Sequence, residues 1–238
     1  MNSKLATLTI ISPNKSSRTV DGKTYGIDTI TIHCMAAPWT SKRCGEYFSS
    51  KDVEASSNYG IGKDGDIALY VPETHRSWAS SNRVNDARAI TIEVACEYKH
   101  PYKVTDAALN SLINLCADIC QRNGINALVW SNSKSDRINH ANGCNMTVHR
   151  DFVNKACPGD YLMGKMPFIA SEVNKLLKST NTQEGKPMTD YEKEFAKAIE
   201  LGITDGTNPD GNATRRQVAV MVLRAIKIVF KLLGKVEV

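Results

Sequence analysis

The stretch DTITIHCM, residues 28–35, is rich in β-branched and apolar residues and predicts a buried strand that ends near His33. Residues 58–71, NYGIGKDGDIALYV, contain two strand-like halves around an Asp-Gly pair, which supplies the positive φ of a tight hairpin. A third strand pattern, AITIEVA, covers residues 89–95 and is apolar almost throughout, apart from Glu93. Such continuous hydrophobicity is typical of a central strand that is covered on both faces.

Helical patterns follow these strands. In residues 106–123 apolar side chains recur at helical spacing, with Thr105 as a candidate N-cap and Gly124 as a stop. Residues 125–148 are polar and rich in Asn and Ser, and a further helix after them should end near Lys178. The alternation of strands and helices predicts an α/β or α+β domain.

The chain has room for more than one domain. Its 238 residues suffice for one substantial domain and a small one. Residues 179–187, STNTQEGKP, have the short, polar, Gly- and Pro-marked composition of a linker. The sequence therefore divides into a first domain over residues 1–178, a linker over residues 179–189 and a helical module over residues 190–238.

Composition and charge limit the classes of partner. The chain carries 30 Lys and Arg against 25 Asp and Glu, a net charge of +5, but these residues are scattered. A diffuse positive charge attracts an anionic cell wall as well as a nucleic acid, and charge alone does not choose between them. Because no dense basic run is present, the nucleic-acid interpretation has weak support, and we expect no nucleic-acid partner. The odd number of cysteines, seven, fits synthesis in a reducing compartment, and neither a signal peptide nor a membrane span is evident.

Two histidines and one cysteine are candidate metal ligands. His33 and His149 each lie at the end of an element, and Cys157 follows His149 beside a proline and a glycine. Three protein ligands leave one coordination position open, as a catalytic zinc requires, whereas a structural zinc has four. On residue types alone, such a trio is also compatible with ordinary core or surface residues.

Four segments in this order carry a family resemblance: TIHCM, SSNYGIGKDGDI, AITIEVA and MTVHRDFVNKACPGDYL. They resemble the zinc N-acetylmuramoyl-L-alanine amidases of phage endolysins and bacterial autolysins, whose fold is shared with peptidoglycan recognition proteins. The most specific part is H-x7-C with a lysine two residues before the cysteine, here His149, Lys155 and Cys157. The resemblance covers roughly residues 25–178 and implies an α/β fold in which helices flank a central mixed β-sheet.

The resemblance also implies roles for individual residues. His33, His149 and Cys157 take the three zinc positions. Lys155 matches the family's catalytic lysine, which suits a cation beside the oxyanion of amide hydrolysis. Tyr59 and Glu93 match residues that orient the attacking water, and a carboxylate is able to accept its proton, but the sequence does not decide between the two. The implied reaction is hydrolysis of the bond between N-acetylmuramic acid and L-alanine by zinc-activated water.

Two residues of the segment THRSWAS are candidate substrate-binding residues. By resemblance, His75 and Trp78 lie where family members place groove residues that contact the sugar or the stem peptide. An aromatic ring suits a glycan face. Trp78 as a core anchor and His75 as a loop residue without a special role remain alternatives.

The C-terminal module consists of two helical patterns, residues 189–201 and 214–233, joined by a turn-rich segment. The sequence FAKAIELGITDGTNPDGNATRRQVAVMVLRAI resembles an S-layer-homology repeat. Such repeats bind secondary cell-wall polymers, which would tether the enzyme to its substrate. The alternatives are packing on the amidase domain, self-association through the apolar face of the second helix, and contact of its basic residues with a membrane surface.

The sequence-based hypothesis is a phage or prophage endolysin that degrades the peptidoglycan of a Gram-positive host. It would be made in the host cytoplasm and then released to the cell wall. The alternatives are a bacterial autolysin and a non-catalytic peptidoglycan-binding protein of the same fold. A non-catalytic relative would be expected to lack a zinc ligand or the lysine, and this chain has all four residues.

Overall fold

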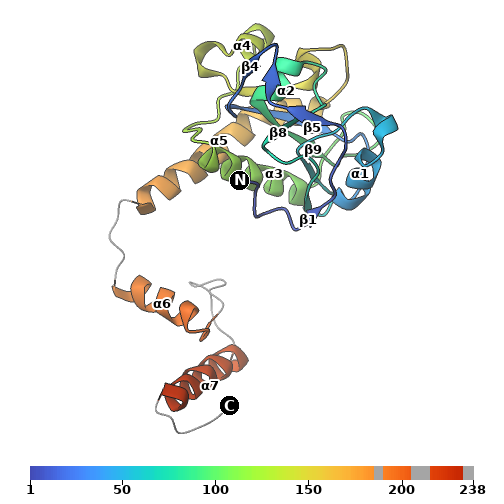
Figure 1. The fold of residues 1–238 in the computed structure, drawn as a ribbon. Coiled ribbons are helices and arrows are strands. Elements are labelled where there is room, and N and C mark those ends of the chain that lie inside the picture. The colour runs from blue at the N-terminus through green and yellow to red at the C-terminus, as the bar shows by residue number, and fades with distance from the viewer. Residues whose placement is uncertain (185–189, 205–214, 233–238) are drawn as a thin grey trace. The chain divides into compact units, whose positions relative to one another are not determined.

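A six-stranded sheet forms the centre of the N-terminal part of the protein (Figure 1). The computed structural model describes residues 1–184, 190–204 and 215–232, and the chain divides into two units, Met1–Asn181 and Thr182–Val238. All pairs of neighbouring strands in the sheet are parallel except β6 with β7, so the sheet is mixed. The strands lie in the order β1 (Leu8–Thr9), β7 (Ile67–Leu69), β6 (Tyr59–Ile61), β9 (Ala89–Val94), β5 (Thr29–Cys34) and β10 (Met146–Val148).

The two faces of the sheet differ in polarity because successive side chains of a strand point to opposite faces. Ile30 and Ile32 of β5, and Ile90 and Ile92 of β9, belong to the main hydrophobic core. On the other face, Thr31 and His33 follow each other in β5, and Thr91 and Glu93 do so in β9. The sheet therefore has one apolar face and one buried polar face.

Helices α3 (Asp106–Arg122) and α5 (Asp160–Glu184) contribute the other half of the main core, against the apolar face of the sheet (Figure 1). The Thr105 hydroxyl caps α3 by accepting a hydrogen bond from the Ala108 backbone N–H. A second, smaller core lies under helix α1 (Ser41–Phe48) and includes Phe48 and Tyr70. The helices are thus arranged on the sheet as the α/β prediction requires.

Short elements surround the polar face and the edges. Strands β2 and β8 pair antiparallel, as do β3 and β4. Helix α2 and strand β8 both contact the central strand β9. The bounds are β2 Lys15–Ser17, β3 Thr19–Val20, β4 Lys23–Thr24, β8 His75–Ser77, α2 Arg83–Arg88, α4 Lys134–Asn139 and three single-turn 3₁₀ helices at Lys51–Val53, Ala141–Gly143 and His149–Asp151.

The structure confirms the predicted α/β fold and its main elements. The strand of residues 89–95 is central, and residues 58–71 form the hairpin, with Gly65 at a φ of 85° in the turn. The sequence missed β10, because three residues after a polar stretch carry too little periodicity to indicate a strand. Helix α5 continues to Glu184, six residues beyond the expected end at Lys178.

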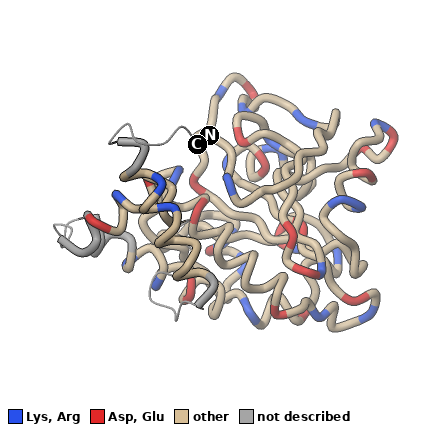
Figure 2. Tube along the Cα trace, turned by 90° about the horizontal axis from the view of Figure 1, so that it is seen from below, with Lys and Arg blue, Asp and Glu red and all other residues tan. Residues whose placement is uncertain are grey.

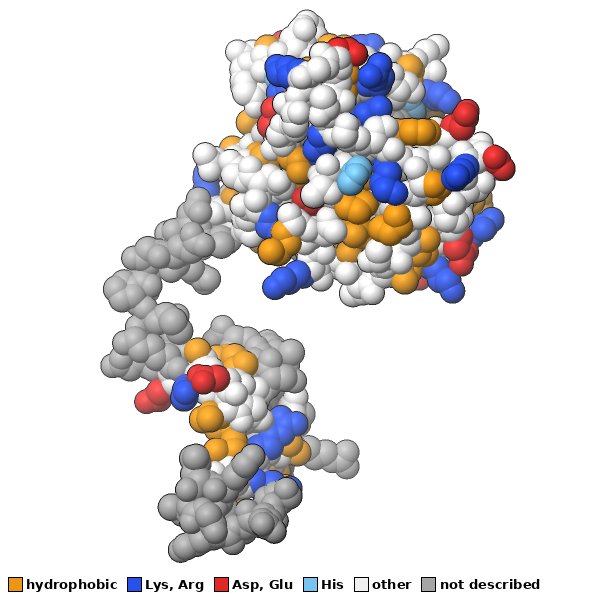
Figure 3. All heavy atoms as spheres, viewed as in Figure 1, with side chains coloured by type: hydrophobic (Ala, Val, Ile, Leu, Met, Phe, Trp, Pro, Cys, Tyr) orange, Lys and Arg blue, Asp and Glu red, His pale blue; other side chains and the backbone are white. Residues whose placement is uncertain are grey.

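The second unit contains two described helices, α6 (Asp190–Glu200) and α7 (Arg215–Leu232). These agree within one or two residues with the helical patterns of the sequence, while the predicted turn at residues 205–214 lies outside the described residues. Apolar side chains are exposed along α7 (Figure 3), namely Val218, Val220, Val222, Leu223, Ile226 and Val229. None of the helices in the described part of the chain is long and apolar enough to cross a membrane.

Charged residues are dispersed over the first unit. Figure 2 shows Lys and Arg interspersed with Asp and Glu along the whole trace, without a dense basic region. This distribution agrees with the scattered charge of the sequence.

Candidate metal centre and groove

The sheet topology brings two candidate ligands together. Strands β9, β5 and β10 are adjacent and parallel, so their carboxyl ends meet at one edge of the sheet. His33 lies near the end of β5 and is the register partner of Glu93 on β9, and His149 follows the last residue of β10 directly. The carboxyl edge of parallel strands is where α/β proteins commonly place a ligand site.

Cys157 completes a cluster with the two histidines. The candidate ligand atoms of His33, His149 and Cys157 all lie within 4.8 Å of one another. Cys157 Sγ is 3.5 Å from His33 Nδ1, and the two imidazole rings have centroids 5.0 Å apart. The backbone N–H of Cys34 points at the same sulfur, at 3.4 Å. The three residues predicted as metal ligands are therefore neighbours in space, although more than a hundred residues separate His33 from the other two in the sequence.

The cluster fits a zinc ion on its own chemistry. The Nε2 atoms of His33 and His149 are buried and have no hydrogen-bond partner, and a buried polar atom normally has one. Burial lowers the pKa of His33 to about 3 and also lowers that of His149, which leaves both imidazoles neutral and able to donate a lone pair. Two imidazoles and one thiol are a donor set that zinc prefers, with one position left for water or substrate.

Arg137 and Asp151 form a buried ion pair that supports the turn at His149. The Asp151 carboxylate accepts a hydrogen bond from the Val148 N–H at 3.0 Å and lies 2.6 Å from Arg137 Nη2. Both side chains are almost fully buried, and the Arg137 guanidinium also stacks 4.4 Å above the ring of Trp130. These contacts fix the backbone from which His149 projects.

Glu93 is the acidic group of the site. Its Oε1 is 3.9 Å from His33 Nδ1, while Oε2 is buried without a hydrogen-bond partner. Burial, followed by the nearby Cys34, raises the pKa of Glu93 to about 8. A carboxyl group whose pKa lies this close to physiological pH is able both to accept and to donate a proton.

Tyr59 does not lie at this site, in contrast to the expectation from the sequence. In the register of β6 with β9, Gly60 pairs with Glu93, so Tyr59 points to the opposite face of the sheet. Its hydroxyl is fully buried, donates to Glu73 Oε1 at 2.6 Å and accepts from the Ser3 N–H. Of the two candidates for orienting water, the structure brings only Glu93 to the histidine and cysteine cluster.

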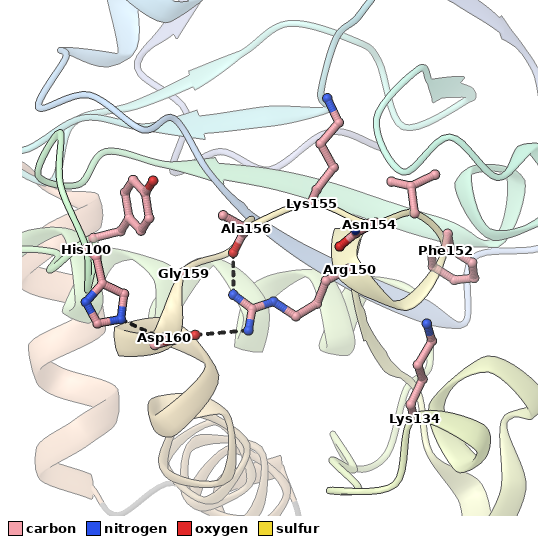
Figure 4. Close-up of a pocket in the computed structure, with 11 residues that line it drawn as sticks. His100, Lys134, Arg150, Phe152, Asn154, Lys155, Ala156, Gly159 and Asp160 are labelled. Carbon is pink, nitrogen blue, oxygen red and sulfur yellow. Dashed lines mark hydrogen bonds and ion pairs between the residues drawn. The ribbon is translucent and has the colours of Figure 1, made fainter.

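Lys155 borders two cavities, one of which also has His149 in its wall. One cavity of about 810 Å³ has Arg150, Phe152 and Lys155 in its wall, and Figure 4 shows Lys155 and Arg150 pointing in different directions from the same loop. Another of about 420 Å³ is bordered by His149, Lys155 and Trp78. The pKa of His149 is lowered by burial and, to a smaller extent, by the positive charge of the exposed Lys155 ammonium. The cluster borders the smaller cavity at His149, and we call the two cavities that share Lys155 the arms of a groove.

Of the two candidate substrate-binding residues, Trp78 lines the groove and His75 does not. Trp78 is half-buried in the wall of the smaller cavity, and its indole Nε1 donates to Ser16 Oγ at 2.9 Å. His75 borders neither arm of the groove, and its Nδ1 is 3.0 Å from the Thr74 hydroxyl. Arg76, which the sequence analysis did not single out, lines the arm with Trp78, and its Nε is buried without a partner. The sequence held a signal for Arg76, because it lies two positions before Trp78 and residues two apart on a strand share a face.

An α/β domain with a two-histidine, one-cysteine cluster at the carboxyl edge of its sheet, open to a groove, has the organisation of a metal-dependent hydrolase. Residues 23–160, more than half of the chain, match the sequence profile of the N-acetylmuramoyl-L-alanine amidases. The protein belongs to this family of peptidoglycan-cleaving enzymes, in which a His-His-Cys triad is typical of the zinc site. No curated protein matches the chain by sequence.

Among solved structures, one of PlyL shows the same fold, and further matches are also of low sequence identity. A mutant of PlyL is 14% identical, with a TM-score of 0.51, and the match covers 70% of this chain and 96% of that one. The PlyG catalytic domain is 16% identical, with a TM-score of 0.49 and coverage of 76% and 98%. The endolysin amidase LysCS from Clostridium intestinale is 18% identical, with a TM-score of 0.44 and coverage of 68% and 95%.

Proposed function

We propose that this amidase is a zinc-dependent endolysin, which cleaves the N-acetylmuramic acid to L-alanine bond in the wall of a Gram-positive host. The observation that carries the zinc proposal is the convergence of His33, His149 and Cys157, with two imidazole Nε2 atoms buried and unpartnered. The endolysin proposal is supported by the joining of an amidase unit to a separate helical unit, an arrangement suited to a lytic enzyme held at its substrate.

In the proposed reaction Glu93 is the proton carrier. Zinc, when bound, supplies a Lewis acid that activates water at neutral pH and polarises the amide carbonyl. The Glu93 carboxylate faces the cluster and accepts the proton of the attacking water, and the resulting acid protonates the departing L-alanine amine. Lys155 borders the groove beside His149, where its ammonium stabilises the negative charge that develops on the carbonyl oxygen.

The groove has room for substrate on both sides of the reacting bond. Because Lys155 borders both arms, we place the scissile amide beside it, with the sugar in one arm and the stem peptide in the other. In the smaller arm Trp78 offers an aromatic face, which suits the apolar side of a sugar or of a peptide residue. His75, which borders neither arm, has no part in this proposal.

The first test is the chemistry of the products. Purified protein incubated with Gram-positive cell walls should release new amino groups without new reducing sugar ends, because the bond that breaks is an amide. Removing the metal with a chelator should abolish the release, and adding zinc back should restore it. Reducing ends without amines would contradict amidase action, and full activity in the chelated protein would contradict the zinc proposal.

We further propose that the C-terminal unit binds a secondary cell-wall polymer, as the resemblance of its sequence to an S-layer-homology repeat suggests. Deleting residues 190–238 should weaken sedimentation of the protein with intact walls while leaving hydrolysis of soluble muropeptides unchanged. The separation of the two units at residue 181 supports independent roles. Unchanged wall binding together with a loss of dimers would instead favour self-association through the apolar side chains of α7.

A further inference from the structure

Arg150 connects the two segments that carry His149 and Cys157. It follows His149 directly, and its side chain reaches back across the loop that ends at the cysteine (Figure 4). The guanidinium donates to the backbone carbonyl of Ala156 and, from Nε at 3.4 Å, to that of Cys157. Its Nη1 donates to Asp160 Oδ1 at 3.0 Å. The Arg150 side chain therefore binds three acceptors at or near the cysteine, two backbone carbonyls and one carboxylate.

The loop between His149 and Cys157 has few other restraints. Residues 154–156 are exposed, and no strand pairing includes them. Within the loop the backbone hydrogen bonds join residues that are close in sequence, such as that from the Lys155 N–H to the Val153 carbonyl at 2.9 Å. The Cys157 sulfur contacts both the backbone N–H and the thiol of Cys34, and it lies near His33. These contacts are weak, so the position of the sulfur also depends on the backbone of its own loop.

The anchor of Arg150 is also fixed. Asp160 is the first residue of α5, and its other carboxylate oxygen lies 2.8 Å from His100 Nε2. The hydrogen bonds from His100 and Arg150 lower the pKa of Asp160, so this carboxylate stays ionised at neutral pH. A guanidinium presents several N–H donors in a rigid plane, and this geometry lets it hold two carbonyls and a carboxylate at once.

We propose that Arg150 is a positioning residue, which fixes the loop of Lys155 and Cys157 relative to His149 and so sets the distance between the thiolate and the imidazole ligands. The inference rests on the proposed zinc site. It assigns to Arg150 a role in metal affinity, although the side chain contacts no ligand atom. Groups that orient metal ligands in this way typically contribute about 10- to 100-fold to metal affinity.

The competing role for Arg150 is direct binding of an anionic group of the substrate, because the residue also borders the larger cavity. The two roles differ in what they change. A substrate-binding arginine affects KM and leaves zinc affinity alone. A positioning arginine changes zinc affinity in the absence of any substrate.

The test is zinc affinity, measured by competition with a chromophoric chelator on the full chain. Arg150→Met should bind zinc about 10- to 100-fold more weakly than the wild type. Arg150→Lys, which keeps the charge but not the planar fork, should recover only part of this loss. Asp160→Asn should show a smaller loss of the same kind. Arg88→Met is the matched control, because Arg88 is 27% exposed and pairs with the Asp28 carboxylate, as the 28% exposed Arg150 pairs with that of Asp160, yet it lies away from the loop.

Two results would overturn the proposal. Zinc affinity of Arg150→Met within twofold of the wild type, with a raised KM, would make Arg150 a substrate-binding residue. A loss of stability in the metal-free Arg150→Met protein, seen in urea unfolding and as large as the loss in zinc affinity, would make its role purely structural. Failure of the zinc site itself is distinguishable, since the wild type would then bind no zinc.

Discussion

Replacing Cys157 with alanine should remove zinc from the protein and reduce amide hydrolysis by at least about a thousandfold. The thiol lies 3.5 Å from His33 Nδ1 and is one of the three proposed ligands, so its loss would leave only the two imidazoles of His33 and His149. Two neutral ligands compete poorly with a chelator, whereas the thiolate also neutralises part of the zinc charge. Zinc content, measured by atomic absorption after dialysis, should fall from about one per chain to almost none.

Cys144→Ala provides the matched control for this experiment. Cys144 is another free thiol, which is buried, and its sulfur donates a weak hydrogen bond to the Met146 carbonyl. Its removal should leave zinc content and activity close to those of the wild type. A Cys157→Ala protein that keeps one zinc per chain would show that the metal binds elsewhere. His149→Ala should behave like Cys157→Ala.

Glu93→Gln should keep its zinc and lose most of its activity. The substitution preserves the size of the side chain but removes the group that accepts a proton, and general base catalysis typically contributes about 10²- to 10⁴-fold. Glu93 Oε2 is buried and unpartnered beside His33, and this position leaves it free to take the proton of the attacking water. The expected result is a fall in kcat of about a thousandfold, with KM little changed, on a soluble muropeptide.

The control for this change is Glu97→Gln, four residues further along the chain and exposed at the surface. It removes the same charge at a distance from the cluster and should leave kcat unchanged. Equal loss in both variants would point to a general effect of charge. A Glu93→Gln protein with wild-type kcat would mean that another group carries the proton, and a loss of zinc in this variant would assign Glu93 to metal binding.

The sequence was sufficient for the fold class and for the candidate ligands. His33 was found because a run of β-branched residues indicates a strand and places the histidine at its end. His149 and Cys157 were found through a specific spacing with Lys155. The strand before His149 was missed, since β10 is only three residues long and its burial comes from its neighbours. Its pairing with β5 is what places His149 beside His33.

Tyr59 was expected beside the metal cluster, but the register of its strand directs its side chain to the other face of the sheet. A strand sends successive side chains to opposite faces, so a position in a motif does not fix which face a residue takes. Here Gly60 pairs with Glu93, and Tyr70 occupies the space beside Gly60, with its hydroxyl 2.1 Å from where a Cβ would lie. Tyr59 instead joins Glu73 in the buried network of the other face. Only the pairing of β6 with β9 reveals this.

The position of Lys155 also makes it a natural reporter of ligand occupancy. Its side chain borders both arms of the groove, so a molecule bound in either arm would shield the same amine from solvent. The rate at which Lys155 reacts with a water-soluble acylating reagent should therefore fall when a ligand occupies either arm. Fragments that bind on opposite sides could be compared on one scale, and compounds that span the scissile position would give the strongest protection.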